Sequence, residues 1–319
     1  MRHWTRASAF VMLLAASGLA PAFAGRLASA GEQDKAAKPA PEFADVTYGP
    51  HERNVFDLWR PKGDGPFPLV LYIHGGGFMA GDKKSLNAAA LQGYLNAGWA
   101  VAAINYRFTN VAPAPAQYLD CARALQTLRH RAKEWKLDPK LVASTGGSAG
   151  AGTSMWLAFH DDLADPKSED PIARESTRLT CISVNDGQSS YDPRFAEKIG
   201  IPRPNFDRHR FFLAFYGIQA DEIDTPKAYA RYEAAAPITY LTKDDPPAML
   251  SYSYPNDEVD AKSNIELVVH HPKLGLALKE RMDQLGIECR VFYKGMPEGP
   301  RMSTIDFFRK HFENARPAK

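Results

Sequence analysis

Residues 141–150 read Leu-Val-Ala-Ser-Thr-Gly-Gly-Ser-Ala-Gly, and this stretch decides the fold. Its first half is a short apolar run typical of a buried strand, and residues 151–159 that follow it predict a helix. A Gly-x-Ser-x-Gly run between a strand and a helix is typical of a sharp turn that lifts a serine hydroxyl above the end of a sheet. Ser148 is therefore the predicted nucleophile position, although the same pattern also fits a plain tight turn or an anion site at a helix N-terminus.

A second glycine-rich stretch, His74-Gly75-Gly76-Gly77-Phe78, directly follows the apolar run at residues 69–73. Acyl transfer builds negative charge on a carbonyl oxygen, which needs backbone N–H donors already in place. The amides of Gly76, Gly77 and Ala149 are predicted to converge on that oxygen. His74 precedes the glycines, so we expect it to orient their loop by hydrogen bonding rather than to act as a base.

Apolar and amphipathic runs alternate along the rest of the chain. They predict strands at residues 43–48, 53–59, 69–73, 99–105, 141–145, 179–184, 248–253 and 287–293, and helices at residues 86–96, 117–135, 151–159, 272–285 and 305–311. Strands separated by helices favour an α/β fold with a mainly parallel central sheet that helices cover on both faces. The predicted domain spans residues 43–319.

Residues 185–240 interrupt this alternation with a long aromatic segment. Loops of this length without any structure are uncommon. We therefore predict a cap insertion over the carboxyl edge of the sheet, where open α/β folds bind ligands. Most of its aromatic side chains are expected to fill the cap's own core, and one or two are expected to face a pocket.

The first residues have the pattern of an export signal. Two arginines precede an apolar stretch at residues 7–20, and residues 22–24, Ala-Phe-Ala, fit a cleavage site. The apolar stretch is shorter than the ~20 residues of a membrane span, which favours a cleaved signal peptide at residues 1–24 over an uncleaved anchor. Residues 25–42 predict a disordered leader. We expect a secreted or periplasmic chain, cut after Ala24, with no integral membrane segment after signal removal.

Charge and cysteine content exclude some partners and cofactors. The formal net charge is +2, and removal of the signal peptide takes away two arginines and no acid, so the expected mature chain is neutral. This balance gives no support for a nucleic-acid partner. Cys121, Cys181 and Cys289 lie in apolar surroundings and are expected to be buried free thiols. No Cys or His spacing suggests a metal, so the sequence implies no metal and no organic cofactor.

The two glycine-rich motifs and their strands resemble the α/β-hydrolase superfamily. Within it they resemble the hormone-sensitive-lipase-like and feruloyl-esterase-like (BD-FAE) carboxylesterases, from about residue 53 to the end of the chain. In that family a Pro-Pro pair introduces the strand that precedes the catalytic acid, and here Pro246-Pro247 leads to Asp257. A slip of one residue would place Asn256 there instead. Asp257 is preferred because a carboxylate stabilises the imidazolium that forms during catalysis.

The catalytic base departs from the family pattern. The family carries Tyr-x-Gly-x-x-His after the last strand, whereas residues 293–299 read Tyr-Lys-Gly-Met-Pro-Glu-Gly, with Glu298 in place of the histidine. A serine hydroxyl is a poor nucleophile without a base of pKa near 7. One hypothesis takes the base from the lengthened acid loop, with His271 ahead of His270 because Pro272 would fix its helix start. The others make Glu298 the base or orienting group, or leave the triad without function.

The sequence therefore predicts a secreted serine carboxylesterase that hydrolyses small or carbohydrate-linked acyl esters. The predicted catalytic residues are Ser148, Asp257 and His271, and the predicted oxyanion donors are Gly76, Gly77 and Ala149. The alternative is a catalytically impaired hydrolase that acts as an extracytoplasmic binding protein, because the usual histidine is missing.

Overall fold

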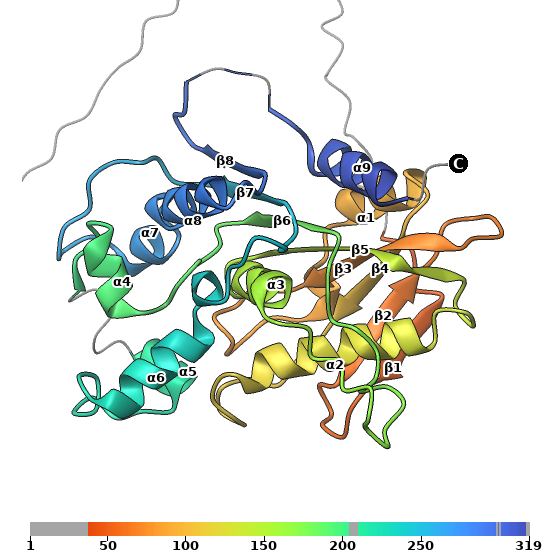
Figure 1. Ribbon diagram of the computed structural model, residues 1–319, viewed down its shortest axis with the longest axis horizontal. Coiled ribbons are helices and arrows are strands. Elements are labelled where there is room, and N and C mark those ends of the chain that lie inside the picture. Colours follow the sequence, from red (N-terminus) through yellow and green to blue (C-terminus); the bar gives the residue numbers. More distant parts are fainter. Residues whose placement is uncertain (1–37, 204–209, 298, 300, 317–319) are drawn as a thin grey trace, which may run out of the picture. The chain divides into compact units, whose positions relative to one another are not determined.

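A computed structural model describes residues 38–203, 210–297, 299 and 301–316 of this chain. In them an eight-stranded sheet runs in the order β1-β2-β4-β3-β5-β6-β7-β8 (Figure 1). The strands are β1 (Phe43–Thr47), β2 (Val55–Trp59), β3 (Phe67–Ile73), β4 (Ala100–Ile104), β5 (Leu137–Gly147), β6 (Cys181–Asn185), β7 (Ala248–Tyr252) and β8 (Cys289–Tyr293). β2 pairs antiparallel with β1 and β4, and all the other neighbours are parallel. The predicted α/β fold with a mainly parallel sheet is confirmed.

Helices cover both faces of this sheet (Figure 1). The main ones are α1 (Ala88–Asn96), α2 (Ala116–His130), α3 (Ala149–Phe159), α8 (Lys273–Gln284) and α9 (Thr304–Ala315). Buried side chains of α1 and α9 join one apolar cluster, and those of α2, α3 and α8 join the other. The predicted signal peptide lies outside the described residues, as does all of the predicted leader before residue 38.

Alternate side chains of strand β3 pack into the two apolar clusters on opposite faces of the sheet. Leu69, Leu71 and Ile73 belong to the cluster under α2 and α3, whereas Val70 belongs to the cluster under α1 and α9. Successive side chains of a strand point to opposite faces, so a strand buried on both sides reads as one continuous apolar run. Burial on both faces fixes the end of β3, and with it the start of the glycine-rich loop.

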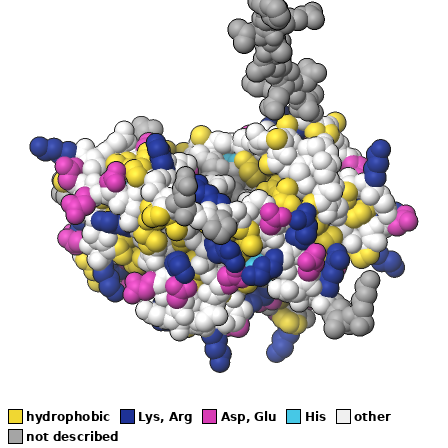
Figure 2. Space-filling view, turned by 90° about the horizontal axis from the view of Figure 1, so that it is seen from above, with side chains coloured by type: hydrophobic (Ala, Val, Ile, Leu, Met, Phe, Trp, Pro, Cys, Tyr) yellow, Lys and Arg dark blue, Asp and Glu magenta, His cyan; other side chains and the backbone are white. Residues whose placement is uncertain are grey.

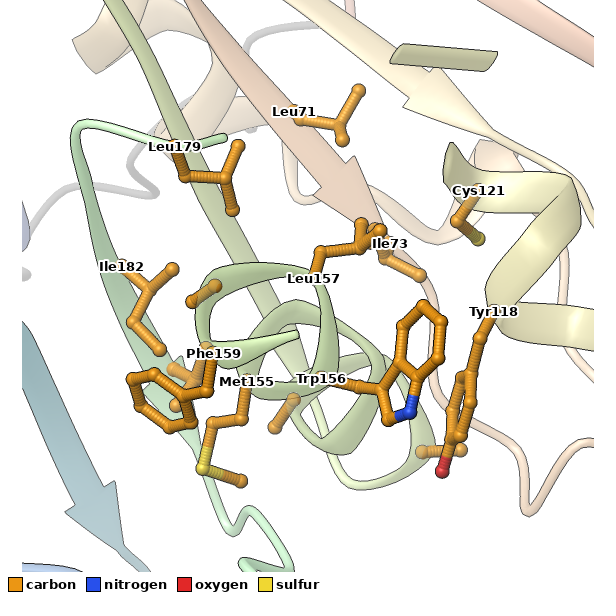
Figure 3. Packing of buried hydrophobic residues seen from close by; sticks show 14 of the residues in the cluster. Leu71, Ile73, Tyr118, Cys121, Met155, Trp156, Leu157, Phe159, Leu179 and Ile182 are labelled. Atoms are coloured by element: carbon orange, nitrogen blue, oxygen red, sulfur yellow. The ribbon is translucent and has the colours of Figure 1, made fainter. Parts of the chain in front are cut away.

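Helix α3, which starts directly after Ser148, is buried along its whole length. Figure 3 shows Leu157 beside Ile73 of the sheet, and Trp156 turned toward Tyr118 of α2. The Trp156 and Tyr118 rings stack at a centroid distance of 4.9 Å. Stacked aromatic pairs add ~0.5–1.5 kcal/mol beyond the area that they bury. The helix that carries Ser148 at its start is thus held on all sides.

The segment at residues 185–240 contains short helices rather than an irregular loop. They are α4 (Pro193–Lys198), α5 (Arg210–Tyr216), α6 (Pro226–Ala235) and the 3-10 helix η3 (Pro237–Thr239). Phe212, Phe215 and Tyr216 of α5 are buried. The Phe215 ring stacks on Phe78, the residue after the glycine-rich loop, at 4.7 Å. The insertion therefore packs directly on the loop that the sequence singles out.

Outside the insertion, the α-helix that precedes α8 was not predicted. The connection between β7 and α8 contains α7 (Ile265–Val269), whose N-cap residue Asn264 accepts a hydrogen bond from the Glu266 amide at 2.8 Å. Val268 of this helix is fully buried. A helix of five residues is too short to give a periodic pattern in the sequence.

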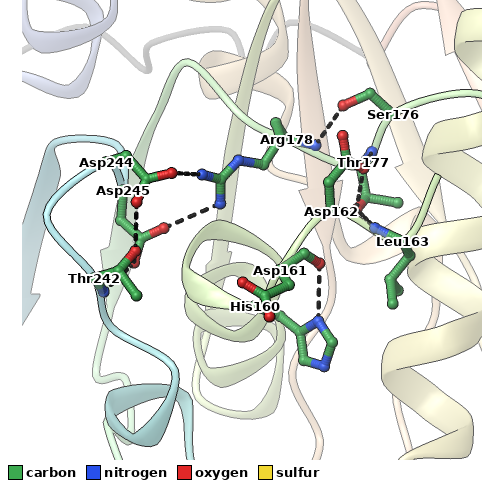
Figure 4. Close-up of polar contacts among 10 residues, drawn as sticks. All are labelled: His160, Asp161, Asp162, Leu163, Ser176, Thr177, Arg178, Thr242, Asp244 and Asp245. Carbon is green, nitrogen blue, oxygen red and sulfur yellow. Dashed lines mark hydrogen bonds and ion pairs between the residues drawn. The ribbon is translucent and has the colours of Figure 1, made fainter.

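Charged contacts fix the opposite edge of the sheet, away from Ser148. Figure 4 shows Arg178, which precedes β6, between the carboxylates of Asp244 and Asp245, which precede β7. Burial raises the pKa of the Asp245 carboxyl, and the adjacent guanidinium opposes that shift. In the same view Asp162 accepts hydrogen bonds from the amide and the hydroxyl of Thr177. These contacts tie the segments that lead into β6 and β7 to the body of the fold.

The state of the cysteines and the distribution of surface charge agree with the expectations from the sequence. Cys121, Cys181 and Cys289 are buried and free, as predicted. Lys and Arg side chains are interspersed with Asp and Glu on the face drawn in Figure 2, with no large patch of one sign. Among the described residues, no helix is long and apolar enough to cross a membrane.

Candidate active site

Ser148 lies on a strained turn between β5 and α3. Its backbone has a φ of 51° and a ψ of −120°, a conformation that L-residues rarely adopt. Glycines on both sides make the turn possible, because a Cβ at Gly146 or Gly150 would lie 2.3 or 2.0 Å from the Ile73 carbonyl oxygen. Such backbone strain costs about 1–3 kcal/mol and is concentrated at functional sites.

The Ser148 side chain opens into a cavity of about 460 Å³. The glycine-rich loop contributes Gly76, Gly77 and Met79 to its wall, the insertion contributes Gln188, Tyr191 and Phe211, and the β7–α8 connection contributes Ile265, Glu266, Val269 and His270; Ser148 and Ala149 complete the lining. The volume is in the range of small-molecule sites. Two aromatic side chains of the insertion reach this cavity, as the sequence predicted.

His270 is the histidine that meets Ser148. Its Nε2 lies 2.9 Å from the Ser148 Oγ, within hydrogen-bond distance. Its other ring nitrogen, Nδ1, lies 3.4 Å from the Glu266 Oε2, one helical turn earlier. A serine hydroxyl that donates to a neutral imidazole is the arrangement that activates a serine as a nucleophile.

His271 was predicted from the sequence to supply this imidazole, and the positions of the two histidines contradict that prediction. His271 is fully buried. Its Nδ1 accepts the Lys273 amide at 3.2 Å, so its Nε2 carries the proton and donates to the Asp257 carbonyl at 2.8 Å. Burial lowers the pKa of His271, which keeps the ring neutral. Both ring nitrogens are already engaged, and neither faces Ser148.

Asp257 was predicted as the carboxylate that orients the catalytic histidine, but its side chain does not contact His270. Its side chain is exposed, and its contact with a histidine is the backbone carbonyl bond to His271. Asn256, the other candidate, is also exposed. The carboxylate that approaches His270 belongs to Glu266, which sequence reasoning missed. Glu298, the remaining candidate, lies outside the described residues.

The predicted oxyanion donors line the cavity into which Ser148 opens; they are Gly76, Gly77 and Ala149. Ala149 is the first residue of α3, so its amide has no partner within the helix and lies at the positive end of the helix dipole. The carbonyl of Gly76 accepts the amides of Met79 and Ala80, which folds the loop back on itself. This geometry is suited to stabilising a negatively charged oxygen.

Comparison with known proteins bears on the fold. The BD-FAE family model matches residues 56–186. The solved structure of a truncated carbohydrate esterase from gut microbiota superposes with a TM-score of 0.61 at 18% identity, covering 85% of this chain and 96% of that one. The chain therefore has the α/β-hydrolase fold and is similar to the BD-FAE family over residues 56–186.

Two Mycobacterium tuberculosis relatives align with about two thirds of this chain. Esterase LipQ is 26% identical over 212 residues, which are 65% of this chain and 47% of the relative. The probable carboxylic ester hydrolase LipM is 28% identical over 207 residues, which are 64% of this chain and 45% of the relative. The chain thus spans about half the length of these curated relatives.

His74 holds the glycine-rich loop, as expected. Arg53 donates to the His74 Nε2 at 3.2 Å, and an arginine can only donate. The His74 Nδ1 must then carry the proton, which it donates to the Gly75 carbonyl at 2.7 Å. Burial lowers the pKa of His74 to about 4, so the ring is neutral at pH 7. Arg53, in the turn between β1 and β2, also donates to the Gly81 carbonyl at 3.1 Å. Sequence reasoning missed this arginine.

Proposed function

We propose that this α/β-hydrolase is a serine carboxylic ester hydrolase. The observation that carries the proposal is the 2.9 Å approach of the His270 Nε2 to the Ser148 Oγ at the wall of a cavity that Gly76, Gly77 and Ala149 also line. The names of the relatives LipQ and LipM support the same class of activity.

The proposed reaction follows from the position of each group. The Ser148 Oγ attacks the ester carbonyl carbon while its proton passes to the His270 Nε2. The carbonyl oxygen becomes an oxyanion, which the amides of Gly76, Gly77 and Ala149 stabilise. His270 then gives the proton to the departing alcohol, which leaves an acyl group on Ser148. Water then attacks that acyl group while it gives a proton to His270. As the bond from the acyl carbon to the Ser148 Oγ breaks, His270 returns the proton to that oxygen, which frees the acid and regenerates the serine.

The proposed substrates are esters with small acyl groups, carbohydrate-linked ones included. Support comes from the cavity, whose volume of about 460 Å³ suits a small molecule and whose wall includes Met79, Tyr191 and Phe211. The alternative of a non-catalytic binding protein rests on the missing histidine after the last strand, and the 2.9 Å contact between the His270 Nε2 and the Ser148 Oγ argues against it. Export through the segment at residues 1–24 stays part of the proposal and rests on the sequence alone.

The test of this function combines turnover with covalent labelling. The purified chain is expected to hydrolyse p-nitrophenyl acetate and butyrate, and a fluorophosphonate probe is expected to stop that turnover and modify one peptide. Mass spectrometry should find the phosphonyl group on the tryptic peptide that contains Ser148. Heat-unfolded protein is the control. Absence of turnover on a broad panel of esters, together with no adduct on Ser148, would overturn the proposal.

The contacts of Arg53 with His74 and Gly81 lead to a prediction about the glycine-rich loop. Substitution of Arg53 by Met removes the donor to the His74 Nε2 and frees the His74 ring to change its tautomer. Because one oxyanion donor contributes about 10²–10³ in rate, a loosened loop is expected to lower kcat about 10-fold with little change in KM. Steady-state kinetics on p-nitrophenyl butyrate measure this effect. Arg60→Met, whose guanidinium pairs with Glu42 away from the loop, is the matched control. Equal kcat values for the two variants would contradict the assigned role.

A further inference from the structure

The connection between β7 and α8 contains two side chains of the Ser148 site, a carboxylate within α7 and an imidazole at its end. Glu266 lies in the first turn of α7, and His270 is the C-cap residue four positions later, so the two side chains lie on the same side of the helix. The His270 Nε2 meets the Ser148 hydroxyl, and its Nδ1 lies 3.4 Å from the Glu266 Oε2. Both residues line the cavity.

The chemistry of a neutral imidazole decides what Glu266 can do. Such a ring has one donor and one acceptor nitrogen, and the bond that one nitrogen makes sets the state of the other. For Nε2 to accept the Ser148 proton, Nδ1 must carry the ring proton. The group that lies within reach of Nδ1 is the carboxylate of Glu266, an acceptor that matches a proton at that position.

We propose that Glu266 is the positioning residue of this site. Its carboxylate accepts the Nδ1 proton, holds the Nε2 acceptor on the Ser148 hydroxyl, and stabilises the imidazolium that forms after proton transfer. Glu266 touches neither the serine nor the ester carbonyl. The inference rests on the proposed ester hydrolase function, and it places the base and its orienting acid one helical turn apart on one short helix.

The helix that carries the pair is firmly anchored. The Gln188 side chain, which is 2% exposed, donates to the Val269 carbonyl at 2.8 Å and so pins the last turn of α7 beside Ser148. Val268 is fully buried. An anchored helix fixes His270 to within the small tolerance that proton transfer needs.

Two other carboxylates near this edge of the sheet, those of Asp186 and Asp257, are engaged elsewhere or exposed. Asp186 accepts the amide and hydroxyl of Ser253 at 2.7 and 2.8 Å. Asp257 is exposed, and its backbone carbonyl is bound by His271. Glu266 itself is 66% exposed, so water competes with the contact. Its expected contribution is therefore smaller than the ~10⁴-fold effect of a buried triad aspartate.

The kinetic test compares two substitutions at Glu266. Glu266→Ala removes the acceptor and is expected to lower kcat about 10- to 100-fold, less than the ~10⁴-fold effect of a buried triad aspartate, with KM changed less than about threefold. Glu266→Gln keeps a carbonyl acceptor without charge and is expected to recover part of that loss. Glu258→Ala, an exposed glutamate of the same connection that does not line the cavity, is the matched control. In a His270→Ala background, Glu266→Ala is expected to have no further effect on kcat.

A spectroscopic measurement keeps the inference testable without turnover. The ¹⁵N shifts of the His270 ring should show the proton on Nδ1 in the unchanged protein and a shift toward the Nε2 tautomer in Glu266→Ala. An active protein whose Glu266→Ala variant keeps kcat and the same tautomer would overturn the inference and leave the proposed function standing. An inactive protein that shows this tautomer change would overturn the proposed function alone. An effect on KM only would assign Glu266 to substrate binding and overturn its positioning role.

Discussion

Ser148→Ala is expected to lower kcat on p-nitrophenyl butyrate by about 10⁴-fold or more. Loss of the nucleophile in a serine hydrolase removes covalent catalysis, and the oxyanion donors and substrate binding leave a residual activity far below that of the intact site. The His270 Nε2 would then have no hydroxyl to activate, although the cavity and its amides would be unchanged. Steady-state rates, together with loss of the fluorophosphonate adduct, measure the effect.

The backbone of Ser148 supplies a control that separates chemistry from folding. Alanine at this position keeps a side chain at a φ of 51°, so the unfolding temperature of Ser148→Ala is expected to stay close to that of the unchanged protein. Ser148→Gly relieves the strain, because glycine adopts positive φ at no steric cost. It is expected to be equally inactive and more stable by about 1 kcal/mol. A Ser148→Ala variant that retains substantial turnover would contradict the assignment of the nucleophile.

The strand–turn–helix around Ser148 could be predicted because its determinants are local. The apolar run, the flanking glycines and the following helix are adjacent in the sequence, and each restricts the backbone of its neighbours. The same holds for the glycine-rich loop after β3. The strands of the sheet could be predicted because burial on both faces leaves a continuous apolar run in each of them.

The acid and the base could not be predicted in the same way, because they depend on a helix with no clear pattern. Helix α7 has five residues, fewer than two turns, and most of its stability comes from contacts with distant residues such as Gln188. The one local signal was the spacing of Glu266 and His270, which fits a single helix face. That spacing is common on exposed helices and does not by itself indicate a site.

The choice of His271 over His270 had a correct premise and a wrong conclusion. Pro272 does fix the start of α8, and His271 is held rigidly before it. The Lys273 amide, which has no partner within α8, takes the His271 Nδ1 as its acceptor. The His271 Nδ1 accepts the amide at the N-terminus of α8, and its Nε2 donates to the Asp257 carbonyl. Neither ring nitrogen is therefore left for Ser148.

His270→Ala is accordingly expected to lower kcat by about 10³-fold or more. General base catalysis contributes roughly 10²–10⁴ to the rate of enzymes, and in the proposed reaction His270 acts both when Ser148 is acylated and when the acyl group is hydrolysed. His270 is only partly buried, and its ring bonds lie within the site, so the unfolding temperature is expected to change little. Rates of turnover and of fluorophosphonate labelling should fall together.

His271→Ala is the comparison that separates the two neighbours. It leaves the Asp257 carbonyl and the Lys273 amide without their partner and opens a void at a fully buried position. Each unsatisfied buried polar group costs about 1–3 kcal/mol, so the variant is expected to lose stability in urea unfolding. At temperatures where it stays folded, its kcat is expected to exceed that of His270→Ala by at least 10-fold, because its ring makes no contact with Ser148. The reverse order of kcat, with both variants folded, would show that the imidazole serving Ser148 is His271 and that the contact seen with His270 is not the one used in catalysis.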